Sequence, residues 1–144
     1  MPYATQNDLL QRMTLVQLTQ LTDDGNTGSP DAVIVGAALE EASGRVDAYC
    51  RERYVTPLQA SDTVTTLTRD IAAYFLFSRR PAKMSDTVRQ RYEDAMALLK
   101  DISAGKAVLD QPVSAASPQS TATGATLPTT SKLRFNDCDI SGYV

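Results

Sequence analysis

The sequence predicts an all-α protein, a small helical bundle of four to five helices around one long helix, with an extended C-terminal arm. Apolar residues recur at three- and four-residue steps along several stretches, which is the spacing of one face of an α-helix. A Ser, Thr or Asp in the position of an N-cap precedes each stretch. After residue 109 the pattern stops, and Ser, Thr, Ala and Pro dominate the chain. Its 144 residues suit a single folded domain.

Two short helices are expected near the N-terminus. Thr5 is placed to cap the first, and Thr14 is placed to cap the second. Both are so short that docking on longer helices must stabilise them. The stretch 22–30 that follows is dense in turn-forming residues, so we expect an exposed loop there.

The long helix is predicted over residues 31–54, with Asp31 as its N-cap. Thr56 is held away from helical angles by Pro57, so the helix should end at Tyr54 or Val55. One helix cannot bury its apolar stripe alone, and other helices must therefore pack on it. The stripe consists of Val35, Ala38, Leu39, Ala42, Val46, Tyr49 and Cys50.

Two more helices follow. Ser61 or Asp62 is placed to cap the first of them, and Pro81 ends it. Ser85 is placed to cap the second, and Gly105 suits the position just past its C-terminus. The helical domain is therefore expected to end near residue 109.

We divide the chain into a helical domain, residues 1–109, and a flexible arm, residues 110–144. Residues 111–130 carry no charge and too little apolar surface to offset the entropy cost of ordering. An apolar end on such a strap suits a peptide that binds a partner, although an incidental frayed tail is the alternative. The candidate partner-binding residues are Leu133, Arg134, Phe135, Ile140 and Tyr143.

Composition excludes several classes of function. The net charge of −3 argues against a nucleic-acid-binding module with a basic face. Histidine is absent, which removes the commonest general base and the usual zinc ligand. Cys50 and Cys138 have no metal-ligand spacing. We therefore expect a protein without enzymatic activity, metal or cofactor, and we find no apolar run of the ~18 residues that a membrane span needs.

Basic residues gather around one predicted helix–helix connection. One interpretation is a surface for ion pairs with a neighbouring subunit or another protein. Helix-dipole compensation with solvated charge is an equal alternative, and contact with DNA phosphates is a third. The candidates are Arg79, Arg80, Arg89 and Arg91, with Lys83 between them. The acidic loop 23–31 does not match the spacing of a calcium loop, so we interpret it as a solvated turn.

Short motifs occur in a fixed order across residues 3–109. They are Tyr3-Ala4-Thr5, Asp8-Leu9, Leu21-Thr22-Asp23, Asp47, Tyr49, Arg53-Tyr54, Pro57-Leu58, Asp70-Ile71-Ala72, Tyr74, Arg91-Tyr92, Ile102-Ser103-Ala104-Gly105 and Leu109. Each motif is short, but their order and spacing over this length make the combination specific. In these motifs the chain resembles the head-completion or head–tail adaptor proteins of Mu-like phages and prophages.

The resemblance implies a structural virion protein. Members of that family form a ring, usually of twelve copies, below the portal protein at the capsid vertex. The ring extends the DNA channel, lets DNA pass without specific binding, and gives the tail-side neck or stopper protein a place to attach. The implied location is the neck of the virion, and the host cytoplasm during assembly. The resemblance implies no membrane partner.

A second class of function stays open. The chain could be a monomeric helical module that binds or regulates another protein, with the C-terminal residues as a linker. Assembly together with a portal protein would separate these two classes. An enzyme is a distant third, because the sequence offers no nucleophile–base pair and no metal-ligand set.

Overall fold

A computed structural model describes residues 1–114 of the chain. It contains α1 (Gln6–Leu10), α2 (Leu15–Thr22), α3 (Ala32–Cys50), α4 (Asp62–Ser78) and α5 (Asp86–Ala104), with a short 3-10 turn, η1 (Pro81–Lys83). Within this part of the chain there is no β-strand, so the all-α prediction is confirmed.

The predicted N-caps explain where the longer helices begin. The side chain of Asp31 accepts hydrogen bonds from the amides at the start of α3, and Ser61 and Ser85 do the same for α4 and α5. Each bond satisfies an amide that has no partner inside its helix. Gly105 follows α5 with a φ of 79°, the left-handed conformation that glycine adopts without strain.

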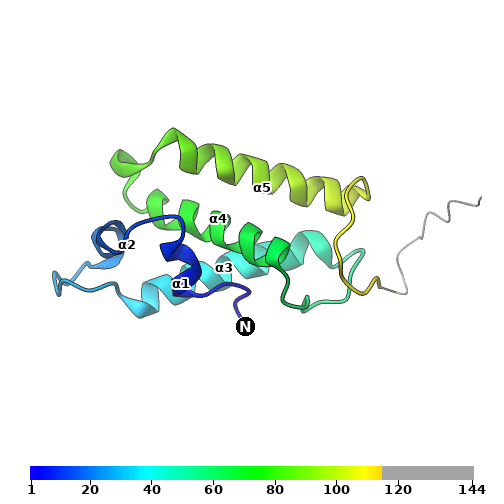
Figure 1. The fold of residues 1–144 in the computed structure, drawn as a ribbon, viewed down its shortest axis with the longest axis horizontal. Helices are drawn as coiled ribbons and strands as arrows, with labels where there is room; N and C mark the ends of the chain where they lie inside the picture. Colours follow the sequence, from blue (N-terminus) through cyan, green and yellow to red (C-terminus); the bar gives the residue numbers. More distant parts are fainter. Residues whose placement is uncertain (115–144) are drawn as a thin grey trace, which may run out of the picture.

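The helix in the middle of the bundle is α4. It packs against α1, α2, α3 and α5, whereas α3 packs mainly against α4 and α5. Figure 1 shows α3, α4 and α5 side by side along the long axis, with α1 and α2 near one end. Helix α4 buries Leu67 and Ile71 on one face, and it also buries Thr68 and Ala73 on neighbouring faces. Burial on several faces lets α4 hold neighbours on several sides.

Helix α3 ends at Cys50, earlier than the predicted Tyr54 or Val55. The chain turns after α3 because the following residues pair with the segment that comes after α5. Tyr54 forms an isolated antiparallel bridge with Val113, and the amide of Val55 donates to the carbonyl oxygen of Pro112 over 3.0 Å. These bonds satisfy backbone groups that a longer helix would have satisfied internally.

Further hydrogen bonds attach residues 110–114 to the bundle. The amide of Ser114 donates to the carbonyl oxygen of Arg53 over 2.8 Å. The side chain of Gln111 accepts from the amide of Gln59 over 2.7 Å and donates to the carbonyl of Gln59 over 2.9 Å. The first residues of the predicted arm therefore belong to the folded unit, and the remainder of the arm lies outside the described residues.

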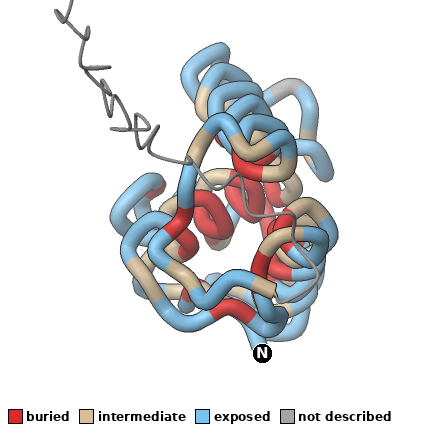
Figure 2. Tube along the Cα trace, turned by 90° about the vertical axis from the view of Figure 1, so that its right-hand side faces the viewer, coloured by how far each residue is buried: buried red, intermediate tan, exposed pale blue. Residues whose placement is uncertain are grey.

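The core lies along the α3–α4–α5 interface. Figure 2 shows buried positions turned inward on the helices that enclose it. Cys50 is fully buried, as its place on the apolar stripe predicts, and burial raises the pKa of its thiol to about 11. The largest fully buried apolar side chains are Leu9, Leu18, Leu21, Ile71, Leu76, Leu99, Ile102, Val46 and Val64.

Two buried threonines differ in their hydrogen bonding. The hydroxyl of Thr22 donates to the carbonyl of Leu18 over 2.8 Å. The hydroxyl of Thr68 is equally buried but has no hydrogen-bond partner within residues 1–114. Burying a hydroxyl without a partner costs free energy that a methyl group of similar size does not cost.

Thr68→Val is therefore expected to raise the free energy of unfolding by up to about 1 kcal/mol. Thr22→Val is the matched control, and it should lower the free energy of unfolding by about 1–2 kcal/mol because it removes satisfied bonds. Urea unfolding followed by circular dichroism measures both values. An equal loss of stability in the two variants would contradict the assignment of Thr68 as an unsatisfied group.

Candidate interaction surface

Two of the predicted arginines bind a loop of the same chain. Arg79 donates to the carbonyl oxygen of Leu21 over 2.9 Å and forms an ion pair with Asp24. Arg80 contacts the other carboxylate oxygen of Asp24 over 3.2 Å. Hydrogen bonds from these two guanidinium groups hold the pKa of Asp24 below its usual value. Arg79 and Arg80 thus join the end of α4 to the loop after α2.

The acidic loop uses its first carboxylate on its own backbone. Asp23 accepts hydrogen bonds from the amides of Thr27 and Gly28 over 2.8 and 2.7 Å, and these bonds lower its pKa. Such an arrangement is typical of a turn closed by an Asp side chain. Across the described residues 1–114, no three His, Cys, Asp or Glu side chains group in a way that could hold a metal ion.

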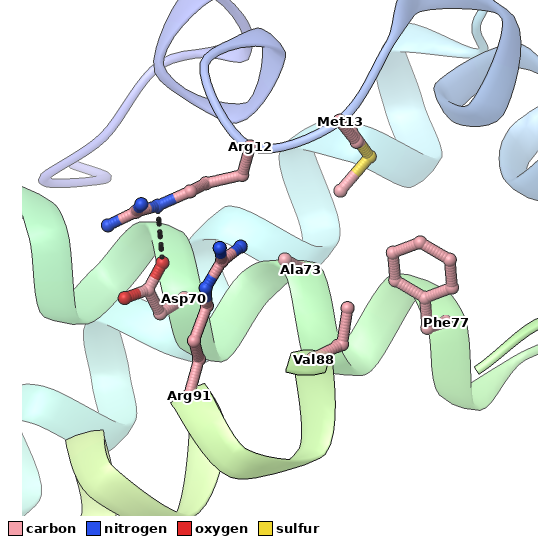
Figure 3. Close-up of a pocket in the computed structure, with 7 residues that line it drawn as sticks. All are labelled: Arg12, Met13, Asp70, Ala73, Phe77, Val88 and Arg91. Atoms are coloured by element: carbon pink, nitrogen blue, oxygen red, sulfur yellow. Dashed lines mark hydrogen bonds and ion pairs between the residues drawn. The ribbon is translucent and has the colours of Figure 1, made fainter. Parts of the chain in front are cut away.

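The structure separates the other two predicted arginines from this loop. Arg89 is exposed on α5, whereas Arg91 is half-buried and lines a hollow between α1, α4 and α5. Figure 3 shows the guanidinium of Arg91 close to Ala73 and to the Arg12–Asp70 pair. The residues that line this hollow are Arg12, Met13, Asp70, Ala73, Phe77, Val88 and Arg91.

Positive charge is concentrated around one carboxylate in this hollow. Arg12 donates from Nε to Oδ1 of Asp70 over 3.0 Å. The buried Nε of Arg69 lies 3.8 Å from the same oxygen, too far for a hydrogen bond, while its Nη1 donates to Gln11 over 2.7 Å. No hydrogen bond or ion pair from residues 1–114 reaches the guanidinium of Arg91.

A groove along the α4–α5 seam continues from the hollow. Asp70 and Arg91 line both, so the two depressions adjoin. We call the second depression the α4–α5 groove; its other lining residues include Thr63, Thr66, Leu67, Asp94 and Leu98. Sequence reasoning named Arg91 as a candidate but missed Arg12 and Asp70, because their pairing joins the turn after α1 to α4, 58 residues away in the sequence.

Several residues of the family-like motifs meet at the N-terminus. The hydroxyl of Tyr3 donates to Asp47 over 2.6 Å and accepts from the amide of Leu58 over 2.9 Å. The amide of Tyr3 also donates to Ser43 over 3.0 Å, and its carbonyl accepts from Thr65 over 3.0 Å. One residue thereby ties the N-terminus to α3, to α4 and to the loop between them.

A second group of motif residues joins the three long helices. The rings of Tyr74 on α4 and Tyr92 on α5 stack with centroids 3.9 Å apart. Arg45 on α3 donates to the hydroxyl of Tyr92 over 3.2 Å and lies 5.1 Å from the centroid of the Phe75 ring. These contacts pack the three helices together.

The predicted partner-binding residues of the C-terminus lie outside the described residues. They are Leu133, Arg134, Phe135, Ile140 and Tyr143. Their proposed contacts stay a prediction. Among the described helices, none combines the length and the hydropathy that crossing a bilayer requires.

Comparison with known proteins gives consistent matches over most of the chain. A family model described as "Bacteriophage Mu, Gp36" matches residues 3–126. The chain is 38% identical over 106 residues to the Mu-like prophage FluMu protein gp36 of Haemophilus influenzae, covering 72% of each chain. It is also 31% identical over 107 residues to Gene product J of Escherichia phage Mu, covering 74% of each chain.

Proposed function

This chain belongs to the bacteriophage Mu Gp36 family, and on that premise we propose that it is a head–tail adaptor of a Mu-like phage or prophage. The adaptor is a non-enzymatic structural protein of the virion neck. Its copies, usually twelve, form a ring beneath the portal protein, and the ring receives the tail-side neck or stopper protein. Before assembly the chain is in the host cytoplasm.

The observation that carries this proposal is that exposed apolar side chains occur at both ends of the bundle. Figure 1 shows α2 and the start of α3 at one end of the long axis, and the chain after α3 and α5 at the other. Each of these side chains is at least 48% exposed. They are Leu15, Val16 and Val33 at the first end, and Val55, Val108 and Val113 at the second.

Two distinct apolar ends suit a protein that must contact different partners on its two sides. Clustered exposed apolar side chains are typical of interaction sites. A head-to-tail contact between unlike faces closes into a ring when the rotation per subunit divides a full turn. The net charge of −3 also favours passage of DNA through such a ring, because strongly cationic walls would retain the genome.

The proposal predicts assembly on the portal protein encoded by the same phage or prophage. The full chain should form a ring on purified portal, seen by light scattering and negative-stain imaging. Val16→Glu and Val108→Glu should each weaken this complex at least about tenfold, because a charge would be buried at the contact. Val16→Thr, which keeps the shape of the side chain, is the matched control and should weaken the complex much less.

A different result would favour the second class of function. A chain that stays monomeric and does not bind the portal would contradict the adaptor proposal. If that monomer bound another protein through the α4–α5 groove, a monomeric protein-binding module would be the better description.

A further inference from the structure

The α4–α5 groove forms a track along α4 that ends at the hollow. At its Asp62 end the track is apolar, with Leu67 and Leu98 in its lining. At its other end lie Arg91 and the Arg12–Asp70 pair. The hollow beyond them has a volume of only about 10 Å³, which is too small to admit a side chain. The track therefore runs from apolar to charged along its length.

At the charged end of the track, Arg91 has no ion-pair partner among residues 1–114. Arg12 pairs with Asp70, and Arg69 lies close to the same carboxylate. Arg91 is half-buried without a hydrogen bond or ion pair from residues 1–114. The facing acids are Asp70 and Asp94; Asp94 already accepts a hydrogen bond from Gln90 over 3.0 Å. A partly buried guanidinium is stabilised by a carboxylate at hydrogen-bond distance, so this position favours an acidic ligand.

The C-terminal segment of this same protein has the complementary order. Leu133 and Phe135 are followed by Asp137 and Asp139, and then by Ile140 and Tyr143. We propose that residues 133–143 of one copy bind in the track of a second copy. In an extended segment, Leu133, Phe135, Asp137 and Asp139 share one face. On that face, Leu133 and Phe135 cover the apolar end of the track, and Asp137 and Asp139 reach Arg91 at the charged end.

The dimensions agree with this occupant. Helix α4 rises about 11 Å from Thr63 to Asp70, which line the two ends of the track. An extended segment from Leu133 to Asp137 spans about 13 Å. The apolar and charged groups of the segment and of the track therefore have similar spacing.

The length of the intervening chain lets the segment reach a neighbouring copy. Gln111 is bonded to Gln59, which lies just before the Asp62 end of the track, so a few residues would suffice to enter it within one chain. Residues 115–132 can span up to about 60 Å when extended. That reach is enough for the track of an adjacent subunit. The proposed ring selects this contact, because only binding between copies links subunits.

The apolar groove on the other side of α4 fits this segment less well. It is lined by Ile34, Phe75 and Glu41, among others. Glu41 would repel Asp137 and Asp139, and Arg79 at its edge is already bound to Asp24.

This inference rests on the proposed function, because head-to-tail binding of arms is the kind of contact that closes a ring. It adds that each copy supplies both the arm and the track. The arm is then committed to a neighbouring subunit, and the portal is contacted by other surfaces.

Cys138, between the two aspartates, provides a natural probe for the test. One full-length chain carries Asp94→Cys and Cys138→Ser, and the other keeps its own Cys138. Cys50 is buried in both and does not compete. The two chains are mixed, oxidised with oxidised glutathione, and analysed on non-reducing gels and by peptide mass, alone and with the portal. Leu98→Cys serves as a second trapping position.

We expect a disulfide between position 94 of one chain and Cys138 of the other. Glu40→Cys, an exposed acidic position on α3 away from the track, is the matched control and should give at least tenfold less product. Arg91→Glu in the first chain should reduce the product at least tenfold. Asp137→Lys with Asp139→Lys in the second chain should then restore it.

Two results would overturn the inference. The first is a disulfide yield for both Asp94→Cys and Leu98→Cys that is no higher than the yield for Glu40→Cys. This comparison is made at the highest soluble protein concentration and in the presence of the portal. The second is observed with a chain that carries Asp94→Cys and keeps its own Cys138. If this chain forms the disulfide within itself more readily than two different chains form it between them, the inference is wrong. Rings on the portal without this disulfide would refute the arm contact alone, whereas the disulfide without rings would refute the adaptor proposal alone.

Discussion

Leu99→Ala is expected to lower the free energy of unfolding by about 3–5 kcal/mol. Leu99 is 0% exposed in the middle of α5, where it belongs to the core shared with α3 and α4. The substitution removes buried apolar atoms and leaves a cavity that the three packed helices cannot close completely. Chemical denaturation with urea, followed by circular dichroism at 222 nm, measures the change.

The neighbouring residue offers a control that uses the same substitution. Leu98 is 38% exposed and lines the α4–α5 groove. Leu98→Ala should change the free energy of unfolding by less than about 1 kcal/mol, since much of its side chain already contacts water. Comparable losses in the two variants would show that α5 is rotated relative to the packing described above.

Tyr3→Phe is expected to cost about 1–3 kcal/mol at neutral pH. The change removes a hydroxyl that donates to Asp47 and accepts from the amide of Leu58. Both partners would be left without this bond in a partly buried position. Tyr49→Phe is the control, because the hydroxyl of Tyr49 makes no hydrogen bond within residues 1–114. A loss in Tyr49→Phe as large as that in Tyr3→Phe would contradict the network.

Tyr3 should also make the free energy of unfolding depend on pH in the alkaline range. Burial, followed by the hydrogen bond to Asp47, raises the pKa of Tyr3 from 10.0 to about 12. The folded state therefore favours the protonated phenol, and this contribution is fully present below pH 10 and lost as the pH rises towards 12. By pH 11 the wild-type chain should lose about 1 kcal/mol through this residue, allowing for solvent screening.

Tyr3→Phe should lack this loss, which unfolding measurements between pH 9 and 11 would detect. Cys50 contributes separately, because burial raises its pKa from 9.0 to about 11 and its contribution is lost over that range. The Cys50 contribution should remain in the Tyr3→Phe variant. If the two chains lost stability in parallel up to pH 11, Tyr3 would not be the titrating group.

Local patterns predict the helices of this chain well, because the information that forms them is local. Asp31, Ser61 and Ser85 cap the helices that follow them, as expected from their positions before apolar repeats. Gly105 likewise ends α5 in the left-handed conformation. Helix periodicity and caps are properties of residues within one or two turns, so they are visible without knowledge of the partners.

The packing and the candidate surface were harder to predict from the sequence, because they depend on residues far apart in the chain. Arg12 lies in the turn between α1 and α2 and Asp70 lies on α4, and nothing near Arg12 marks it as the partner of a carboxylate. The position of α4 in the middle was hidden because Arg69, a charged residue, is among its buried positions. The early end of α3 depends on pairing with Val113, in a stretch without any helical or strand periodicity.

The attachment of residues 111–114 beside the end of α3 determines how a pull on the C-terminal side would be carried. Such a force reaches the bundle first at the bonds of Ser114, Pro112 and Gln111 with Arg53, Val55 and Gln59. These bonds lie next to the start of α4, the helix that holds every other helix in place. Mechanical load is thereby passed to the segment between α3 and α4, and it does not fall first on the C-terminal end of α5.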